Sequence, residues 1–313
     1  MGQIMLYNQH NRARDILALV HQCDNASKLL ELRRNRCILL WQLLQTRNAS
    51  NHKKENAALE LTSEQKQTLY DQGFVKLPGI VPKALVEDAL RAINASLGSE
   101  GIDPARLPTF RSQSYCPEVT TTPPIVRLLN ASPLWSLAES AIGPGAIQPV
   151  QDGQIALRFP VMREAASATP HLDGMYSPNN GVPAGTIRNF TALVGVFLSD
   201  IPHDDMGNLT VWPGTHRLYE NAFRKHGPQS LLNGLPPVEL PQPQQITAQA
   251  GDAVLCHYQL AHGITGNSSP FTRYGIFFRL MHKNHDAWQW ECMTNIWREW
   301  AGMQQIANAS TSA

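Results

Sequence analysis

The sequence predicts a mainly β core, either a sandwich or a jelly roll, with flanking helices, and three observations support this α+β class. From about residue 147 the chain consists of short runs rich in β-branched and aromatic residues, with turn residues between them. Before that point, apolar residues recur at helical spacing. Strands and helices do not alternate regularly, which argues against a parallel sheet built from βαβ units.

The first 60 residues predict a helical N-terminal extension of unknown role. Leucine-rich periodicity covers about residues 12–46, and a polar stretch over residues 48–56 follows it. A targeting or partner-binding helix is one interpretation, and a packed or poorly ordered extension is the simpler one, which we favour. We therefore divide the chain into this extension (1–60), a main domain (61–300) and a polar tail (301–313).

The main domain is predicted to begin with a helix. Thr62 and Gln65 fit a capping box, and the helix should end near Gly73. A first strand and turn over residues 74–79 and a second amphipathic helix over about 83–97 follow. The further strands are predicted over residues 154–159, 190–198, 209–212, 253–257 and 273–281. The Pro/Gln-rich residues 235–245 are predicted to form a surface loop.

Composition excludes several classes of function. The net charge of +1 gives no field that would favour nucleic acid or an anionic membrane. The sequence shows no apolar stretch near the roughly 20 residues of a membrane span, no signal peptide and no C-terminal peroxisomal signal. Five scattered cysteines without a Cys-x-x-Cys pair argue against a disulfide framework or structural zinc. We expect a cytoplasmic protein, and its oligomeric state stays open.

A His-x-Asp unit, His171 and Asp173, is the first candidate for metal binding. On an extended backbone these two side chains point to one face, so that an imidazole and a carboxylate can hold one ion. A second histidine from another strand would complete the two-histidine, one-carboxylate set, which leaves coordination positions open. Chance alone supplies roughly 0.4 such pairs in a chain of this composition. A second pair, His203 and Asp205, lies in a polar segment that we interpret as a turn.

The downstream sequence offers partners for the first pair. His262 follows the apolar run 253–257, and Arg273 begins another predicted strand eleven residues later. A buried dicarboxylate co-substrate requires a fixed cation, and a guanidinium binds a carboxylate through two hydrogen bonds. His257 is a rival of His262 as the distal ligand, and Arg279 is a rival of Arg273 as the anchor.

This ordered set resembles the phytanoyl-CoA dioxygenase (PhyH) family of Fe(II)/2-oxoglutarate-dependent oxygenases. The segment Gly-Asn-Leu-Thr-Val-Trp-Pro-Gly-Thr-His over residues 207–216 and the segment Gly-Phe-Val-Lys-Leu-Pro-Gly over residues 73–79 carry the same resemblance, which covers about residues 61–285. The resemblance implies a double-stranded β-helix core, also called a jelly roll or cupin-like fold. It also implies an enzyme that uses Fe(II), 2-oxoglutarate and O2, with ascorbate as a further candidate cofactor.

The resemblance assigns roles to individual residues. It implies His171, Asp173 and His262 as iron ligands, which favours His262 over His257, and Arg273 as the partner of the far carboxylate of 2-oxoglutarate. Many members of the family have serine two residues after the distal histidine. Here Ile264 stands at that position, and Thr265 follows it as a candidate co-substrate contact.

Further residues have candidate roles beside simpler structural ones. Gln154 and Arg158 share one face of a predicted strand that lines the active site in the family, so they are candidate co-substrate or substrate contacts. His216 is predicted to be structural. Candidate substrate contacts are Met175 and Tyr176 beside the metal motif, and the basic residues Arg217, Arg224 and Lys225 if the substrate is a coenzyme A thioester.

The function implied by the resemblance is hydroxylation of an unactivated C–H bond. The substrate would be a lipid-like or secondary-metabolite small molecule, and succinate and CO2 would be released. Oxidative cyclisation, desaturation or epimerisation on the same scaffold is an alternative outcome. A non-catalytic jelly-roll binding protein is the alternative outside catalysis.

Overall fold

The protein is described by a computed structural model over residues 59–311. All but the last two residues of the predicted N-terminal extension lie outside the described residues. No helix in the described part of the chain is long and apolar enough to cross a membrane.

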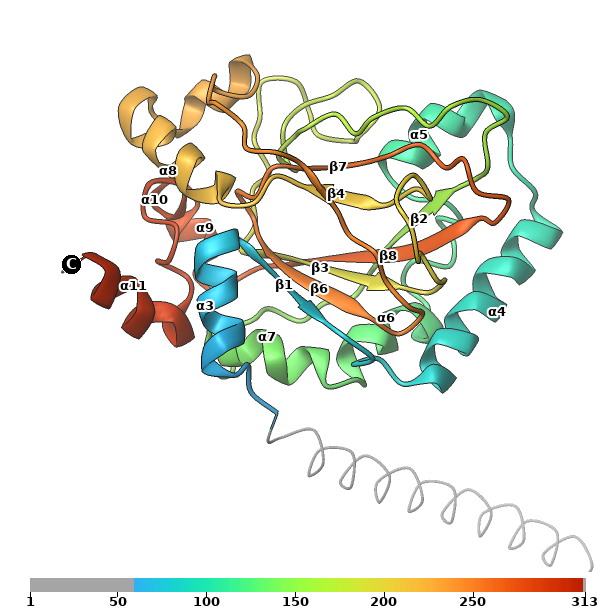
Figure 1. Ribbon diagram of the computed structural model, residues 1–313, viewed down its shortest axis with the longest axis horizontal. Helices are drawn as coiled ribbons and strands as arrows, with labels where there is room; N and C mark the ends of the chain where they lie inside the picture. The colour runs from blue at the N-terminus through green and yellow to red at the C-terminus, as the bar shows by residue number, and fades with distance from the viewer. Residues whose placement is uncertain (1–58, 312–313) are drawn as a thin grey trace, which may run out of the picture. The chain divides into compact units, whose positions relative to one another are not determined.

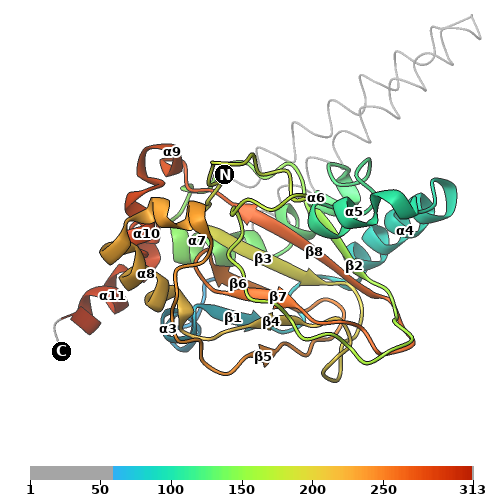
Figure 2. The same ribbon diagram turned by 90° about the horizontal axis from the view of Figure 1, so that it is seen from above.

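Two antiparallel sheets form the core (Figure 1). The larger sheet has the strand order β1-β6-β3-β8-β2, and its strands are β1 (Phe74–Leu77), β6 (Ala253–His257), β3 (Ala192–Phe197), β8 (Arg273–Leu280) and β2 (Gln154–Arg158). The smaller sheet has the order β5-β4-β7, with β5 (Gln244–Gln245), β4 (Leu209–Val211) and β7 (His262–Ile264). In Figure 1, β4 and β7 lie above β1, β3, β6 and β8, and Figure 2 shows the same strands from above. The predicted jelly roll is confirmed.

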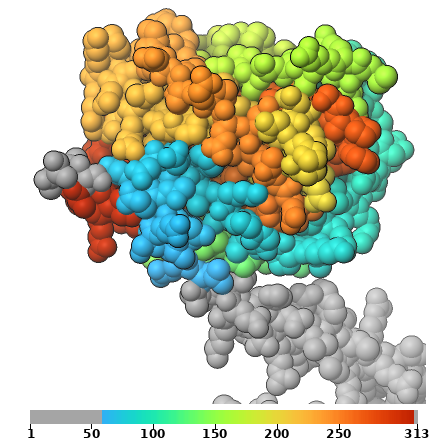
Figure 3. Space-filling model, in the orientation of Figure 1, coloured from blue at the N-terminus to red at the C-terminus, as the bar shows by residue number. Residues whose placement is uncertain are grey.

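Helices cover the outer face and one end of the larger sheet. The helical elements are α3 (Ser63–Gln72), α4 (Lys83–Ser99), η1 (Pro104–Arg106), α5 (Leu107–Ser112), α6 (Pro123–Asn130), α7 (Leu134–Ile142), α8 (Thr215–His226), η2 (Pro228–Asn233), α9 (His285–Trp288), α10 (Glu291–Thr294), η3 (Ala301–Met303) and α11 (Gln304–Thr311). On the face drawn in Figure 3, α3 and α4 (blue to cyan) form the lower part of the described surface, and α8 forms the upper left.

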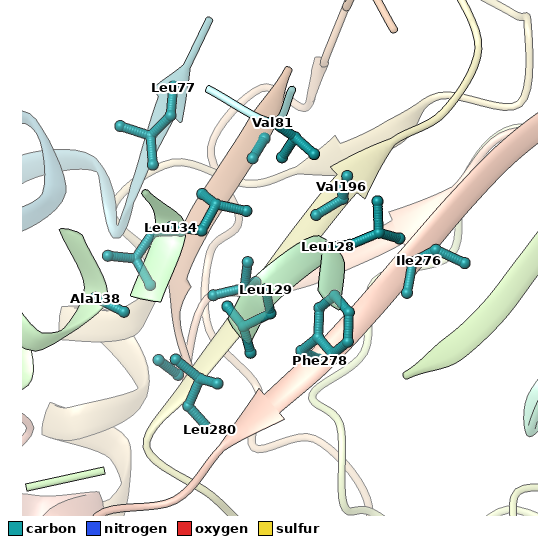
Figure 4. Packing of buried hydrophobic residues seen from close by; sticks show 14 of the residues in the cluster. Leu77, Val81, Leu128, Leu129, Leu134, Ala138, Val196, Ile276, Phe278 and Leu280 are labelled. Atoms are coloured by element: carbon teal, nitrogen blue, oxygen red, sulfur yellow. The ribbon is translucent and has the colours of Figure 1, made fainter. Parts of the chain in front are cut away.

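Strand alternation divides the core into two clusters. On β3, Val194 and Val196 face the helices, whereas Leu193 and Phe197 face the smaller sheet. Figure 4 shows the first cluster, in which side chains of α6 and α7 pack on Val196, Ile276, Phe278 and Leu280 of the larger sheet. The second cluster fills the space between the sheets. Because both faces of β3 are buried, the strand reads as a continuous apolar run.

The predicted start of the domain is confirmed in detail. The Thr62 hydroxyl accepts a hydrogen bond from the Gln65 backbone at 3.1 Å, and the Gln65 side chain accepts one from the Thr62 backbone at 2.9 Å. Gly73 ends α3 in the left-handed region with φ of 81°. The helix therefore delivers the chain directly into β1.

Two predicted segments differ from the structure. The expected loop over 235–245 includes a short strand, β5, that extends the smaller sheet. Residues 301–311, expected as part of a polar tail, form η3 and α11, with Met303 fully buried. Met303 joins the first core cluster, and Ile306 and Ala307 of α11 pack against it, so apolar contacts anchor this segment.

Candidate metal centre and active-site cavity

Backbone pairing fixes the two histidines of the predicted metal set. His171 and His262 form an antiparallel bridge in which each backbone N–H donates to the other residue's carbonyl, at 3.0 and 3.1 Å. Residues paired in this way lie directly opposite each other, so their side chains share one face. The two imidazole rings lie 4.6 Å apart between centroids. Strand β7 therefore brings together two residues that are 91 positions apart.

Asp173 reaches the same point from the turn that follows His171. Its Oδ1 lies 3.6 Å from Nε2 of His171 and 3.6 Å from Nε2 of His262. Gly174 makes the turn possible, because it has φ of 81° and a Cβ there would lie 2.1 Å from the Arg188 carbonyl oxygen. One ligand atom from each of the three residues lies within 4.8 Å of the others, a group that could hold a metal ion.

The two histidines present the nitrogens that a metal requires. Nδ1 of His171 lies 3.3 Å from the Thr169 carbonyl, and Nδ1 of His262 lies 3.0 Å from the Leu260 carbonyl. A carbonyl can only accept, so each Nδ1 carries a proton, and each Nε2 is the nitrogen that can give its lone pair to a metal. Both Nε2 atoms face Asp173 Oδ1, which gives a donor set suited to one ion.

The Asp173 carboxylate divides its two oxygens between different partners. Oδ1 faces the histidines, and Oδ2 accepts hydrogen bonds from Arg279 at 2.6 and 3.0 Å. Burial would raise the pKa of Asp173, but Arg279 and the two histidines outweigh it and hold this pKa well below its ordinary value. Arg279 also donates to the Gln154 side chain at 2.9 Å. The carboxylate is therefore ionised and held in one orientation.

The rival histidine, His257, does not belong to this centre. Its Nε2 donates to the Ile296 carbonyl at 2.9 Å, and its Nδ1 accepts from the Gln259 backbone at 3.0 Å. Its ring is buried against Trp297 and Trp300. His257 serves the packing of the C-terminal segment.

His216 is structural, as predicted, because it is fully buried and its Nε2 contacts the Tyr70 carbonyl at 3.0 Å. The pair His203 and Asp205 lies in a turn, where the Asp205 side chain accepts from Gln245 at 3.0 Å.

A second group of potential ligands is saturated by hydrogen bonds. His285 Nδ1 lies 2.8 Å from Glu299, and His285 Nε2 lies 3.0 Å from the Asn189 carbonyl. Burial raises the pKa of the neighbouring Cys292. Because both imidazole nitrogens are engaged, we interpret this buried cluster as a clamp that fixes the C-terminal segment to the residues before β3.

Arg273 is buried beside Arg158, its register partner on β2. Its Nε donates to the Gly207 carbonyl at 2.7 Å and its Nη1 to the Ala156 carbonyl at 3.0 Å, whereas its buried Nη2 has no partner within the described residues. Burial, and then the charge of Arg158, lower the pKa of Arg273 to about 9. Two adjacent guanidiniums, one of which has an unsatisfied N–H donor, are suited to binding the carboxylate of a ligand.

An inner cavity of about 450 Å³ contains the metal centre. Gln154, Arg158, Met175 and Tyr176 line it, as the sequence analysis suggested. The apolar part of the remaining wall includes Leu172, Leu193, Leu209, Ile264 and Phe277. Arg273, the cross-strand neighbour of Arg158, is not among the residues that line the cavity.

Thr265 is not part of the cavity lining. It is buried, and its hydroxyl lies 3.5 Å from the Asn208 carbonyl. Ile264 forms the wall instead, since residues 262 and 264 share a face of β7 and residue 265 does not.

The basic residues considered for coenzyme A have other partners. Arg217 pairs with Asp71 and Arg224 with Glu220, and none of the three candidates, Lys225 included, lines the inner cavity.

Two imidazoles and one carboxylate on a jelly-roll scaffold, with an adjacent cavity, are the ligand set of non-haem Fe(II) oxygenases. A family model described as phytanoyl-CoA dioxygenase (PhyH) matches residues 69–275, about two thirds of the chain. The chain therefore belongs to the PhyH family. It is a 2-oxoglutarate-dependent dioxygenase by this membership, and Fe(II) and 2-oxoglutarate are its cofactor and co-substrate.

Solved structures of similar proteins are distant in sequence. HygX from Streptomyces hygroscopicus, with nickel and 2-oxoglutarate bound, is 19% identical over 72% of this chain and 88% of its own, with a TM-score of 0.49. EctD from S. alaskensis, with 2-oxoglutarate and 5-hydroxyectoine, is 17% identical over 71% and 76%, with a TM-score of 0.49. The carbocyclase SnoK from nogalamycin biosynthesis is 19% identical over 71% and 84%, with a TM-score of 0.45. No protein with a curated description matches the sequence.

Proposed function

We propose that the protein hydroxylates an unactivated C–H bond of a small molecule, with 2-oxoglutarate converted to succinate and CO2. The observation that carries the proposal is the convergence of His171 Nε2, His262 Nε2 and Asp173 Oδ1 on one point of the cavity wall. Three protein ligands leave positions for a co-substrate and O2, which a closed structural site would not.

The three ligands divide the work of holding Fe(II). The imidazoles contribute neutral donors whose orientation is fixed by their Nδ1 hydrogen bonds, and Asp173 contributes the negative charge. Bound iron, together with 2-oxoglutarate, supplies the activation of O2. The residues around it have to position the reactants and exclude water.

The second part of the proposal concerns the co-substrate. Arg158 lines the cavity, and the buried Arg273 lies opposite it in register on β8, so that the two guanidiniums form a cationic cluster beside the cavity. A carboxylate of 2-oxoglutarate there would satisfy the unpartnered Nη2 of Arg273 and offset the repulsion between the two cations. Ile264 and Leu209 would shield the central part of the molecule from water.

The reaction balances without a further cofactor in the main cycle. One oxygen atom of O2 enters succinate, the other enters the product as a hydroxyl group, and CO2 leaves 2-oxoglutarate.

Each residue of the metal centre and of the inner cavity lies between Arg111 and Arg279 in the sequence. We therefore propose that residues 61–300 carry the complete oxygenase, with residues 1–60 as an appendage.

A screen for compound-stimulated succinate formation, followed by mass spectrometry of the products, tests this function. A product heavier than the substrate by one oxygen atom is expected. Loss of two hydrogens would instead assign desaturation or cyclisation, and an unchanged mass with inverted stereochemistry would assign epimerisation. Absence of succinate under all conditions would favour a non-catalytic binding protein.

A further inference from the structure

The arginines of the described residues fall into two groups. Five of them form ion pairs with a carboxylate: Arg91, Arg217, Arg224, Arg279 and Arg298. The other seven form no ion pair within residues 59–311, and five of these seven lie at the active site. They are Arg158 and the buried Arg273 described above, and three exposed residues, Arg106, Arg111 and Arg188. The remaining two, Arg127 and Arg163, line neither cavity.

A second, outer cavity of about 520 Å³ adjoins the inner one. Both cavities are lined by Gln154, Asp173, Asn180, Arg279 and Ser112, so they adjoin at the metal ligand Asp173. The outer cavity is therefore the space next to the metal centre into which the far end of a substrate would extend.

The two exposed arginines of the outer cavity come from different parts of the chain. Arg106 ends η1, and its guanidinium lies 4.6 Å from the centre of the Phe110 ring. Arg188 follows the turn at Gly174 in the chain, and its backbone N–H donates a hydrogen bond to the Gly174 carbonyl at 3.0 Å. Arg111 of α5 adds a third cation where the inner cavity begins.

Acidic residues do not balance these charges. Two acidic residues, Asp152 and Asp173, line the two cavities. Five arginines line them: Arg106, Arg111, Arg158, Arg188 and Arg279. Asp173 is already paired with Arg279, and Asp152 forms no ion pair with Arg106 or Arg188 within the described residues. An enclosed surface with such an excess of one sign concentrates ligands of the opposite sign.

We infer that the substrate is an amphipathic acid, with its apolar part in the inner cavity and a carboxylate or phosphate group between Arg106 and Arg188. This inference rests on the proposed function, because the inner cavity is taken to hold the reacting carbon. The apolar wall of Leu193, Ile264 and Phe277 favours a hydrocarbon portion next to the metal. The arginines hold the acidic end away from it, so that the acid itself does not reach the iron.

Matched probes with one hydrocarbon chain test the inference. Octanoate, octyl phosphate and neutral octanamide are titrated by calorimetry into full-length protein loaded with Ni(II) and saturating 2-oxoglutarate. At least one of the two anions should bind at least tenfold tighter than octanamide, and which one does so distinguishes a carboxylate site from a phosphate site. In the double variant R106Q/R188Q this preference should fall at least fivefold, whereas in the matched control R127Q it should stay. All three side chains are exposed, and thermal melting verifies folding.

The inference is overturned if octanamide binds as tightly as both anions, or if the preference survives unchanged in R106Q/R188Q. It is also overturned if none of the three probes binds while 2-oxoglutarate does. Failure of the Ni(II)-loaded protein to bind 2-oxoglutarate would instead overturn the proposed function.

Discussion

Arg279 holds the carboxylate of Asp173 from the side opposite the two histidines. Its Nη2 and Nε lie 2.6 and 3.0 Å from Oδ2, while Oδ1 faces the imidazoles. Two N–H groups of the Arg279 guanidinium thus donate to the same carboxylate oxygen. Its Nη2 also donates to the Gln154 side chain. Arg279 thereby fixes which oxygen of Asp173 is presented to a metal.

Loss of Arg279 should therefore weaken metal binding although Arg279 is not a ligand. We expect Arg279→Leu to lower the affinity for Ni(II) by about 10- to 100-fold, the usual effect of removing a residue that orients a metal ligand. Arg279→Lys should be intermediate, because it keeps the charge but not the fork. Calorimetry with Arg127→Leu as control measures this. Unchanged affinity in Arg279→Leu would show that Asp173 is oriented by other means.

His262 and His257 can be separated by paired measurements of metal affinity and stability. His262→Ala should abolish measurable Fe(II) binding, because it removes one of three ligands. His257→Ala should keep the metal but lower the free energy of unfolding by about 2 kcal/mol or more, since it removes two buried hydrogen bonds. Loss of metal in His257→Ala with retention in His262→Ala would reverse the assignment.

Arg273 should control the affinity for 2-oxoglutarate. Arg273→Ala would leave a carboxylate without its buried partner, a cost of about 2–5 kcal/mol, and so at least a tenfold weaker affinity. Ni(II) binding should persist, because Arg273 does not contact the three ligands. Titration of the Ni(II)-loaded variants with 2-oxoglutarate measures this. An unchanged affinity for 2-oxoglutarate in Arg273→Ala would show that another residue is the anchor.

Acid should destabilise the fold through its buried neutral histidines. Burial lowers the pKa of His257 to about 4, and it lowers the pKa of His216 well below its ordinary value. The unfolded chain takes up these protons near pH 6.5, whereas the folded protein does not, so the free energy of unfolding decreases as pH falls from about 7 toward 4.

The slope of this decrease has an upper limit of about 1.4 kcal/mol per pH unit for each histidine. Urea unfolding of metal-free protein at pH 7, 6 and 5 measures it, and His257→Gln should make the dependence shallower. An identical slope in His257→Gln would show that other groups are responsible.

Periodicity and spacing in the sequence were sufficient to predict the β core. The sequence segments of four strands, β2, β3, β6 and β8, are apolar, short and separated by turns. The ends of these strands in the structure lie within two residues of the predicted ends. The helices α5, α6 and α7 were not predicted, because segments of six, eight and nine residues are too short for a helical period to stand out in the sequence.

The sequence also pointed to the three residues of the metal set. It did not show which nearby arginine pairs with Asp173. Arg273 and Arg279 lie six residues apart on one face of β8, and the sequence alone does not say which cation faces Asp173. Thr265 could have been placed correctly, since strand alternation from His262 puts Ile264 toward the cavity and Thr265 away from it.

The most direct test of the account is the fate of O2 at the His171, Asp173 and His262 centre. Purified protein with Fe(II) and 2-oxoglutarate is exposed to ¹⁸O2, and the succinate formed is analysed by mass spectrometry, with His262→Ala as control. We expect succinate that carries one ¹⁸O atom and whose formation requires Fe(II), and we expect none from His262→Ala. Unlabelled succinate, or equal formation by the variant, would contradict it.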